Sequence, residues 1–159
     1  MRLTVYTDYA LRLLMYLALK EDGLATIAEI ADRYRISRNH LMKVAYELGL
    51  AGYVETVRGR GGGLRLAKPP ESIWLGDVVR HTEQDMVLVP CFDSEAAAPC
   101  AIRPACVLRT ALMRANAAFI ETLDEYSLMD LVKPRTPLRD LLSMRRLPAP
   151  KSTRTAGRA

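Results

Sequence analysis

The 159-residue chain lacks long apolar runs, and its longest, at residues 13–19, stops at Lys20, well short of a membrane span. No small-residue cleavage site follows that run, so we expect no secretory signal. Cysteine is scarce, and the odd number of three excludes a complete disulfide framework. From these absences we expect a cytoplasmic protein without a membrane segment.

The chain also lacks the side-chain groupings that mark common enzyme sites. It shows no nucleophile paired with a base, no glycine-rich cofactor loop and no catalytic pair of carboxylates. The composition is that of an ordinary globular protein, 50% apolar and 26% charged, and the chain is long enough to bury a core without disulfides. We therefore predict a binding protein that is not an enzyme.

Basic charge is unevenly spread along the chain. Residues 133–159 carry eight basic residues and one acidic, so the overall net charge of +5 comes from this tail, and the first 132 residues are net negative. Within those residues, the window 33–68 holds eight basic residues against two acidic, between acidic flanks. Positive charge confined to one window suits a surface that contacts phosphates.

Three helices are predicted in the first third of the chain. Apolar residues at helical spacing indicate the first over residues 8–20. Thr26 and Glu29 form a capping box at the start of the second, over residues 27–34. Ser37 can cap the third helix. Two short helices joined by a tight turn are typical of the helix-turn-helix.

A basic β-hairpin is predicted after these helices. Strand-forming residues at 53–57 and 64–66 flank a loop that holds four of the nine glycines. A helix-turn-helix followed by such a hairpin is a winged helix, and residues 74–83 add a further helix. Arginine can read guanine and asparagine can read adenine, while wing arginines can follow the DNA backbone or enter the minor groove. The residues expected to contact DNA are Ser37, Arg38, Asn39, His40, Lys43, Arg58 and Arg60.

Residues 84–106 are predicted to be a functional loop that holds all three cysteines. Cys91, Cys100 and Cys106 each follow a proline by one or two residues, which favours turns. A zinc site would need a fourth ligand, the spacing lacks close cysteine pairs, and His81 is the only nearby imidazole. Thiolates on a flexible loop suit an iron–sulfur cluster or, alternatively, a thiol redox sensor.

The last third of the chain is predicted to begin with one long helix over residues 107–126. Its apolar positions follow heptad spacing with one polar exception, which is typical of a seam that packs against a second copy. These seam residues are Leu108, Leu112, Ala115, Phe119, Thr122 and Tyr126. A short helix at 128–132 follows, and the basic tail at 133–159 is expected to be largely disordered.

The predicted fold class is therefore mainly α with a small β-hairpin. A winged helix-turn-helix DNA-binding domain occupies residues 1–83, and the cysteine loop occupies residues 84–106. Residues 107–132 form the dimerisation helix with the short helix after it.

Five stretches of this sequence resemble the Rrf family of bacterial winged-helix transcription regulators, and the resemblance extends from residue 1 to about residue 142. They are MRLT at 1–4, TDYA at 7–10, the wing VRGRGGGL at 57–64, PAC at 104–106 and DLV at 130–132. The resemblance implies a homodimeric repressor that binds a palindromic operator in double-stranded DNA.

Three groups within this family differ in their sensors. Residues 37–43 most resemble the nitric-oxide-sensing repressors called NsrR. The iron-responsive type called RirA resembles the wing at 54–60 and has a comparably wide gap between its first two cysteines. The type called IscR uses a histidine three residues after the third cysteine, where this chain has Arg109.

Resemblance to the NsrR group implies a [4Fe–4S] cluster, with [2Fe–2S] less favoured, as the sensor of nitric oxide. Its ligands would be Cys91, Cys100 and Cys106, with Asp8 reaching across the dimer as the fourth. Arg12 lies four residues after Asp8 and can pair with it once the cluster is lost, so these two residues form the expected switch. The alternatives are an iron-responsive cluster-binding repressor and a cluster-free thiol redox sensor.

Overall fold

The computed structural model describes residues 2–20, 23–83, 86–92 and 100–144. The helices (α), strands (β) and short 3₁₀ turns (η) in this part of the chain are α1 (Val5–Leu19), α2 (Ile27–Tyr34), α3 (Arg38–Leu50), β1 (Val54–Val57), β2 (Gly63–Leu66), η1 (Pro70–Ser72), α4 (Leu75–Thr82), η2 (Pro90–Phe92), η3 (Arg103–Ala105), α5 (Val107–Asp124), α6 (Leu128–Leu131) and α7 (Arg135–Leu141). The predicted fold class, mainly α with a small β-hairpin, is confirmed. None of the helices in these ranges is long and apolar enough to cross a membrane.

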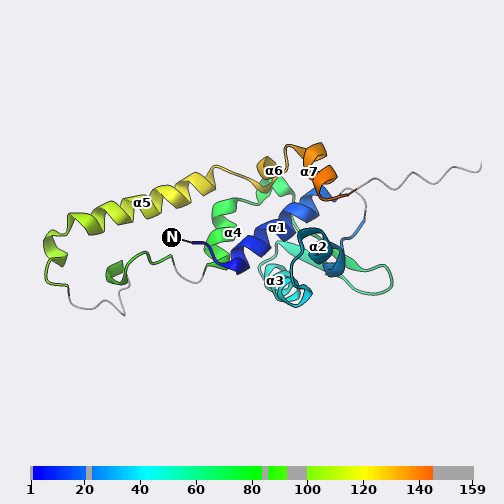
Figure 1. The fold of residues 1–159 in the computed structure, drawn as a ribbon, viewed down its shortest axis with the longest axis horizontal. Coiled ribbons are helices and arrows are strands. Elements are labelled where there is room, and N and C mark those ends of the chain that lie inside the picture. The colour runs from blue at the N-terminus through cyan, green and yellow to red at the C-terminus, as the bar shows by residue number, and fades with distance from the viewer. Residues whose placement is uncertain (1, 21–22, 84–85, 93–99, 145–159) are drawn as a thin grey trace, which may run out of the picture.

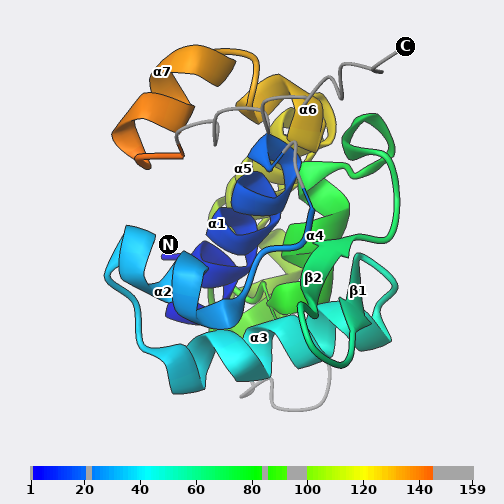
Figure 2. The ribbon, with the colours of Figure 1, turned by 90° about the vertical axis from the view of Figure 1, so that its right-hand side faces the viewer.

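The described elements form two parts, which we call the body (the packed helices around α1) and the arm (α5). Figure 1 shows α5 running away from the other helices as the arm. Figure 2, turned by 90°, shows α1 in the middle of the body, with α2, α3, α4, α6 and α7 around it. The hydrophobic core is therefore built around α1.

Helix α1 is buried along most of its length, as expected for a helix that is apolar on most sides. The sequence predicts this helix over residues 8–20, but it begins at Val5. The earlier start has a local cause, because the Thr4 hydroxyl accepts a hydrogen bond from the Thr7 backbone N–H at 3.2 Å and caps the first turn. Its buried residues are Thr7, Ala10, Leu13, Leu14, Tyr16, Leu17, Ala18 and Leu19.

Glu29 fastens α2 to α1. The predicted capping box is present, with the Glu29 backbone N–H donating to the Thr26 hydroxyl at 3.1 Å and the Thr26 N–H donating to the Glu29 carboxylate at 3.4 Å. The same carboxylate accepts hydrogen bonds from the Tyr16 hydroxyl at 2.8 Å and from Lys20 Nζ at 2.6 Å. Burial raises the pKa of Glu29, but the bonds from Lys20 and Tyr16 outweigh burial and hold the pKa below its ordinary value.

The predicted wing is present as an antiparallel pair of strands. The register sets Val54 opposite Leu66 and Val57 opposite Gly63. The tip turns through Gly59 and Gly61, whose φ angles of +106° and +79° are ones that glycine adopts without strain.

Helix α5 is unbroken, as predicted, and ends at Asp124 rather than at residue 126. None of its residues is buried within the single chain. At its C-terminal end an ion pair between Arg80 and Asp124 holds it to α4, and the Leu75 N–H donates to the Tyr126 carbonyl at 2.9 Å. The arm is therefore fixed to the body at one end and open to solvent along much of its length.

Helix α7 was not expected, because residues 133–159 were predicted to form a largely disordered tail. Arg135 donates to the Ala18 carbonyl at 3.2 Å and Arg139 donates to the Leu19 carbonyl at 2.8 Å. Cations are favourable at a helix C-terminus, where carbonyls lack partners within the helix. Sequence reasoning counted these arginines only as net charge, and the remainder of the tail, 145–159, lies outside the described residues.

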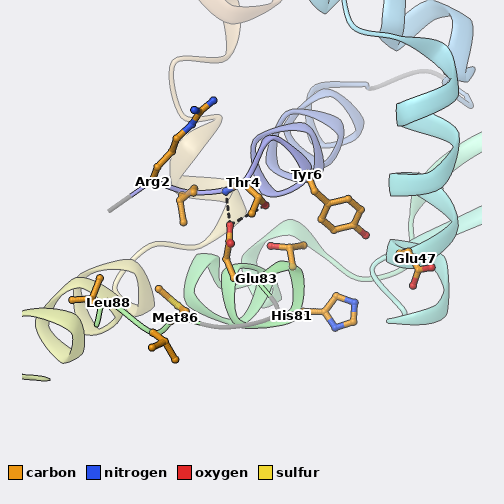
Figure 3. Close-up of a pocket in the computed structure, with 11 residues that line it drawn as sticks. Arg2, Thr4, Tyr6, Glu47, His81, Glu83, Met86 and Leu88 are labelled. Atoms are coloured by element: carbon orange, nitrogen blue, oxygen red, sulfur yellow. Dashed lines mark hydrogen bonds between the residues drawn. The ribbon is translucent and has the colours of Figure 1, made fainter. Parts of the chain in front are cut away.

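Glu83, the C-cap residue of α4, holds the start of α1 (Figure 3). Its Oε1 accepts hydrogen bonds from the Thr4 backbone N–H at 2.8 Å, the Thr4 hydroxyl at 3.1 Å and the Thr7 hydroxyl at 2.5 Å. Burial raises the pKa of Glu83, but the bonds from Thr7 and Thr4 outweigh burial and hold it below its ordinary value. The first turn of α1 is thus tied to the point where the cysteine loop begins.

We predict that Glu83→Gln, which keeps an acceptor oxygen but removes the charge, lowers the free energy of unfolding by about 1–2 kcal/mol near neutral pH. A carboxylate with a depressed folded-state pKa contributes stability above its unfolded pKa, about 4.3, and loses that contribution as the pH falls through the folded-state pKa. Urea unfolding across the acid range should therefore show the two proteins converging below about pH 4. Glu71→Gln, at an exposed carboxylate in η1, is the control, and a gap that persists unchanged into acid would contradict the prediction.

Candidate functional site

The face of α3 that is predicted to read DNA is open to solvent. Arg38, Asn39, His40 and Lys43 are all exposed, and Ser37 is exposed just before them. The opposite face is buried through Leu41, Val44, Ala45 and Leu48. Ser37 occupies the N-cap position, as predicted, but its side chain makes no capping hydrogen bond. Its hydroxyl is therefore not committed to capping the helix.

Arg38 is held by a residue that sequence reasoning did not single out. Its Nη2 lies 3.0 Å from Oδ1 and 3.2 Å from Oδ2 of Asp32, on the neighbouring helix α2. Both side chains are mostly exposed, and such ion pairs are weak in water. Asp32 can therefore orient Arg38 without preventing a stronger contact to a base or phosphate.

Helix α3, the expected DNA recognition helix, also contacts α1. The ring of Tyr9 lies 6.3 Å from the ring of His40, measured between centroids and with the planes tilted by 34°. Tyr9 directly follows Asp8, the expected cluster ligand. A displacement of this part of α1 therefore has a direct path to the start of α3.

The wing carries its two expected DNA-contacting residues at its tip, where Arg58 and Arg60 are both exposed. Farther along the hairpin, Arg65 pairs with Glu55 across the strands at 2.8 Å. In Figure 2 the hairpin lies beside α3, so the wing and the recognition helix are neighbours in space. The structure thus brings together the two segments that the sequence assigned to DNA.

Asp8 pairs with Arg12 within one chain. The distance from Arg12 Nε to Asp8 Oδ1 is 2.9 Å, and the two side chains are 43% and 46% exposed, respectively. The predicted contact is therefore present. Because nearly half of the Asp8 side chain is exposed, its carboxylate can be reached from outside the chain.

The three cysteines are all free thiols, with Cys91 and Cys106 half-buried and Cys100 exposed. Two contacts show that the segment Met86–Phe92 packs against α5 and runs antiparallel to it. Asn116 Nδ2 donates to the Met86 carbonyl at 3.3 Å, and the Arg109 guanidinium lies 5.9 Å from the centroid of Phe92. This packing brings Cys91 to the N-terminal end of α5.

The N-terminal end of α5 begins at another cysteine. Cys106 is the N-cap residue of α5, and its Sγ accepts a hydrogen bond from the Arg109 backbone N–H at 3.4 Å. Cys100 precedes η3 in a turn that is closed by the Arg103 N–H to the Cys100 carbonyl at 3.1 Å. All three cysteines thus belong to segments that meet or lead to the start of α5.

Metal ligands do not converge within the described part of a single chain. No group of three or more histidine, cysteine, aspartate or glutamate side chains there is placed to hold a metal ion. His81, the imidazole considered for zinc, instead lies against Tyr53, with 6.0 Å between ring centroids. Residues 93–99 of the cysteine loop lie outside the described residues.

The donor set nevertheless fits an iron–sulfur cluster better than a bare metal ion. Three unoxidised cysteines on turns supply soft ligands of the kind that such clusters prefer. Beside them, the Nε of Arg109 is buried and has no hydrogen-bond partner among the described residues. An orphaned cationic donor at this place is suited to an anionic group.

A pocket of about 940 Å³ lies between the start of α1, the end of α4 and the segment that follows α4 (Figure 3). Tyr6, Glu47 and Met86 are among its lining residues. Sequence reasoning did not single out these three residues, because they come from three distant segments and form no motif. The pocket leaves the surface beside the first turn of α1 concave rather than closed.

Solved structures match this architecture over most of the chain. CymR (YrzC), described as the global cysteine regulator of B. subtilis, superposes with a TM-score of 0.70 at 27% identity, covering 84% of this chain and 98% of that one. IscR of T. potens superposes with a TM-score of 0.68 at 24% identity, covering 84% and 88%. At 24% identity, the likeness to IscR shows the fold alone.

Curated relatives and a family model identify the chain more closely. The Bacillus licheniformis protein named HTH-type transcriptional regulator NsrR is 52% identical over 144 residues, which are 90% of this chain and 100% of that protein. The Bacillus subtilis protein of the same name is 51% identical over 146 residues, 91% of this chain and 99% of that protein. A family model described as an iron-dependent transcriptional regulator matches residues 3–134. The chain is a transcriptional regulator rather than an enzyme, and it belongs to the Rrf2 family.

Proposed function

We propose that this regulator is a cytoplasmic homodimeric repressor that senses nitric oxide through a [4Fe–4S] cluster and binds a palindromic operator. The cluster ligands are Cys91, Cys100, Cys106 and the partner subunit's Asp8. The observation that carries the proposal is the packing of Met86–Phe92 along α5, which gathers the cysteine segments at one end of that helix. The relatives named NsrR support the same assignment.

Operator recognition rests on α3 and the wing. The exposed start of α3 enters the major groove, where Arg38 and Asn39 can form bidentate contacts with base edges. Arg58 and Arg60, on a glycine tip, follow the phosphate backbone or the minor groove. A palindromic site then needs two such units about one helical turn apart.

The dimer rests on the seam of α5. Leu108, Ala115, Thr122 and Tyr126 are exposed in the single chain, while Leu112 and Phe119 are half-covered by it. An exposed helix with apolar residues in heptad spacing is stable when a second copy covers it. A dimer would also supply the fourth ligand, because the described residues of one chain contain no metal-holding group that unites Asp8 with the cysteines.

The switch uses two alternative partners for Asp8. In the structure Arg12 holds Asp8 at 2.9 Å. When bound, the cluster supplies an iron that accepts a carboxylate and that nitric oxide can attack. If Asp8 binds at the cysteine loop of the partner subunit, it must leave Arg12, and this displaces the first half of α1. Tyr9, which directly follows Asp8, transmits the displacement to His40 on α3. Without the cluster, Asp8 would pair with Arg12 as in this structure, and the restraint on α3 would be relaxed.

Iron sensing by the same scaffold is the second candidate. The family model is described as iron-dependent, and eight residues separate Cys91 from Cys100, as in the iron-responsive resemblance. Both candidates place the same cysteines around a cluster. They differ in the signal that removes it, whereas a cluster-free thiol sensor would need no iron at all.

The visible spectrum of anaerobically purified protein separates the cluster proposals from the thiol proposal. Operator binding should then be measured while nitric oxide or an iron chelator is titrated in. Nitric oxide sensing predicts release at a few molecules of nitric oxide per cluster, before the chelator acts. Release by the chelator alone would favour iron sensing, and a protein that never shows cluster absorbance would remove both.

We predict that Arg38→Ala relaxes base discrimination, whereas Arg60→Ala weakens binding evenly across sequences. Loss of a bidentate base contact should cost roughly 1–3 kcal/mol at one base pair. A lost phosphate contact should lower the slope of log affinity against log salt by about one. Titration of both variants with operators that carry single base-pair changes, over a salt series, distinguishes the two effects. The opposite pattern would reverse the roles of recognition helix and wing.

We predict that Phe119→Asp separates the dimer, because it places a charge within the seam of both subunits. An unpaired buried charge costs roughly several kcal/mol per ion. Sedimentation should show a monomer, and operator binding should be lost with the dimer. Ala117→Asp, at an exposed position on the other side of the helix, is the matched control and should remain dimeric. A dimeric Phe119→Asp would exclude the seam as the interface.

We predict that Asp8→Ala still acquires a cluster, because three thiolates remain, but binds the operator roughly 10- to 100-fold more weakly when loaded. Alanine at any of the three cysteines should instead abolish or severely reduce loading. Arg12→Ala is the matched control, since it removes the same ion pair but leaves the ligand. Anaerobic loading followed by operator titration measures both effects. Tight binding by loaded Asp8→Ala would show that Asp8 does not link the cluster to DNA.

A further inference from the structure

Arg109 has two contacts at the cysteine end of α5. Its backbone N–H donates to Cys106 Sγ at 3.4 Å. Its guanidinium lies 5.9 Å from the centroid of the Phe92 ring, within the range of a cation–π contact. Phe92 directly follows Cys91, so Arg109 contacts Cys106 through its backbone and the segment that carries Cys91 through its guanidinium.

The Arg109 side chain is held against Phe92, but one of its hydrogen-bond donors has no partner in the described part of the chain. Its Nε is buried and has no hydrogen-bond partner among the described residues. A buried donor without a partner is costly, and arginine cannot avoid the cost by losing its proton. The acidic residues of α5, Glu121 and Asp124, lie at the opposite end of the helix. The unmet donor therefore belongs to a residue at the cysteine end of α5, away from the acidic residues of that helix.

The proposed cluster is an anion that matches this donor. A [4Fe–4S]²⁺ core with three thiolates and one carboxylate carries a net charge of −2. Net charge and hydrogen bonds to sulfur are the main means by which a protein sets cluster stability and reduction potential. A fixed cation and the N-terminus of α5 would both offset that charge.

We propose that Arg109 is the charge-balancing positioning residue of the cluster site, held between Cys91 and Cys106 by Phe92 and directed at the cluster anion. The inference rests on the proposed function. It assigns to Arg109 a role in retaining the cluster and setting its reduction potential, without making it a ligand. Arginine suits this role because its planar, permanently charged group can stack on a ring and donate at the same time.

The test compares Arg109→Gln, Arg109→Lys and Phe92→Leu with the wild-type chain. Arg114→Gln, which removes the exposed arginine nearest along α5, is the matched control. Each full-length protein is loaded anaerobically with ferrous iron and sulfide. The rate at which a ferrous chelator removes the iron and the midpoint reduction potential of the loaded protein are then measured. A general loss of folding would lower loading but would not shift the potential of the clusters that remain.

We expect Arg109→Gln to release iron roughly 10-fold faster than wild type, in line with the loss of other groups that support metal ligands. Its potential should fall, because the reduced and more negative cluster loses a neighbouring cation. Arg109→Lys should recover part of both properties, Phe92→Leu should shift them in the same direction as Arg109→Gln, and Arg114→Gln should match wild type.

Each of the remaining outcomes would overturn a specific claim. If the wild-type protein loads and Arg109→Gln has the same iron-release rate and reduction potential as wild type, the role of Arg109 is overturned. The proposed function would still stand. An unchanged Phe92→Leu would overturn the positioning by the ring. Equal shifts in Arg114→Gln would show a general charge effect and overturn the inference. A wild-type protein that never loads would overturn both proposals.

Discussion

The burial of α1 is the constraint on which the rest of the structure depends. Most of the helix is enclosed by the other helices, and its largest buried side chains, such as Tyr16 and Leu13, form the centre of the core. Fully burying one large apolar side chain is worth roughly 1.5–3 kcal/mol, so the body cannot form without this helix. What remains exposed on α1 is a narrow stripe that includes Asp8 and Arg12. Asp8, the proposed fourth cluster ligand, thus lies on the element that organises the core.

Several polar contacts make α1 a junction between distant parts of the chain. At its start, Glu83 binds Thr4 and Thr7 and so connects α1 to the beginning of the cysteine loop. In its first half, Tyr9 lies against His40 of the recognition helix. At its end, Arg139 donates to the Leu19 carbonyl. In the proposed switch, a pull on Asp8 would act on this buried helix, which contacts the expected DNA-reading helix through Tyr9 and His40.

The described part of one chain leaves two features unfinished, and a second copy would complete both. Helix α5 presents apolar residues to water along its seam, which is unfavourable for an isolated chain. The cysteine segments gather at the start of the same helix with three thiols, while the expected fourth ligand lies on α1. Because α5 carries both features, dimer formation and assembly of the proposed site are joined in one element. The orphaned donor of Arg109 lies near that same end of α5.

Features that depend on neighbours a few residues apart could be predicted from the sequence alone. The capping box of Thr26 and Glu29, the glycine tip of the wing and the uninterrupted α5 are set by local hydrogen bonds, backbone freedom and helical spacing. The exposed polar start of α3 also follows from periodicity, so the solvent-facing residues that we propose read DNA could be named as exposed in advance. Only the tertiary structure decided which distant groups these residues meet. Asp32 on Arg38, Glu83 on Thr4, Arg139 on Leu19 and Phe92 on Arg109 join different elements, and the pattern within one segment contains no information about the segment that covers it.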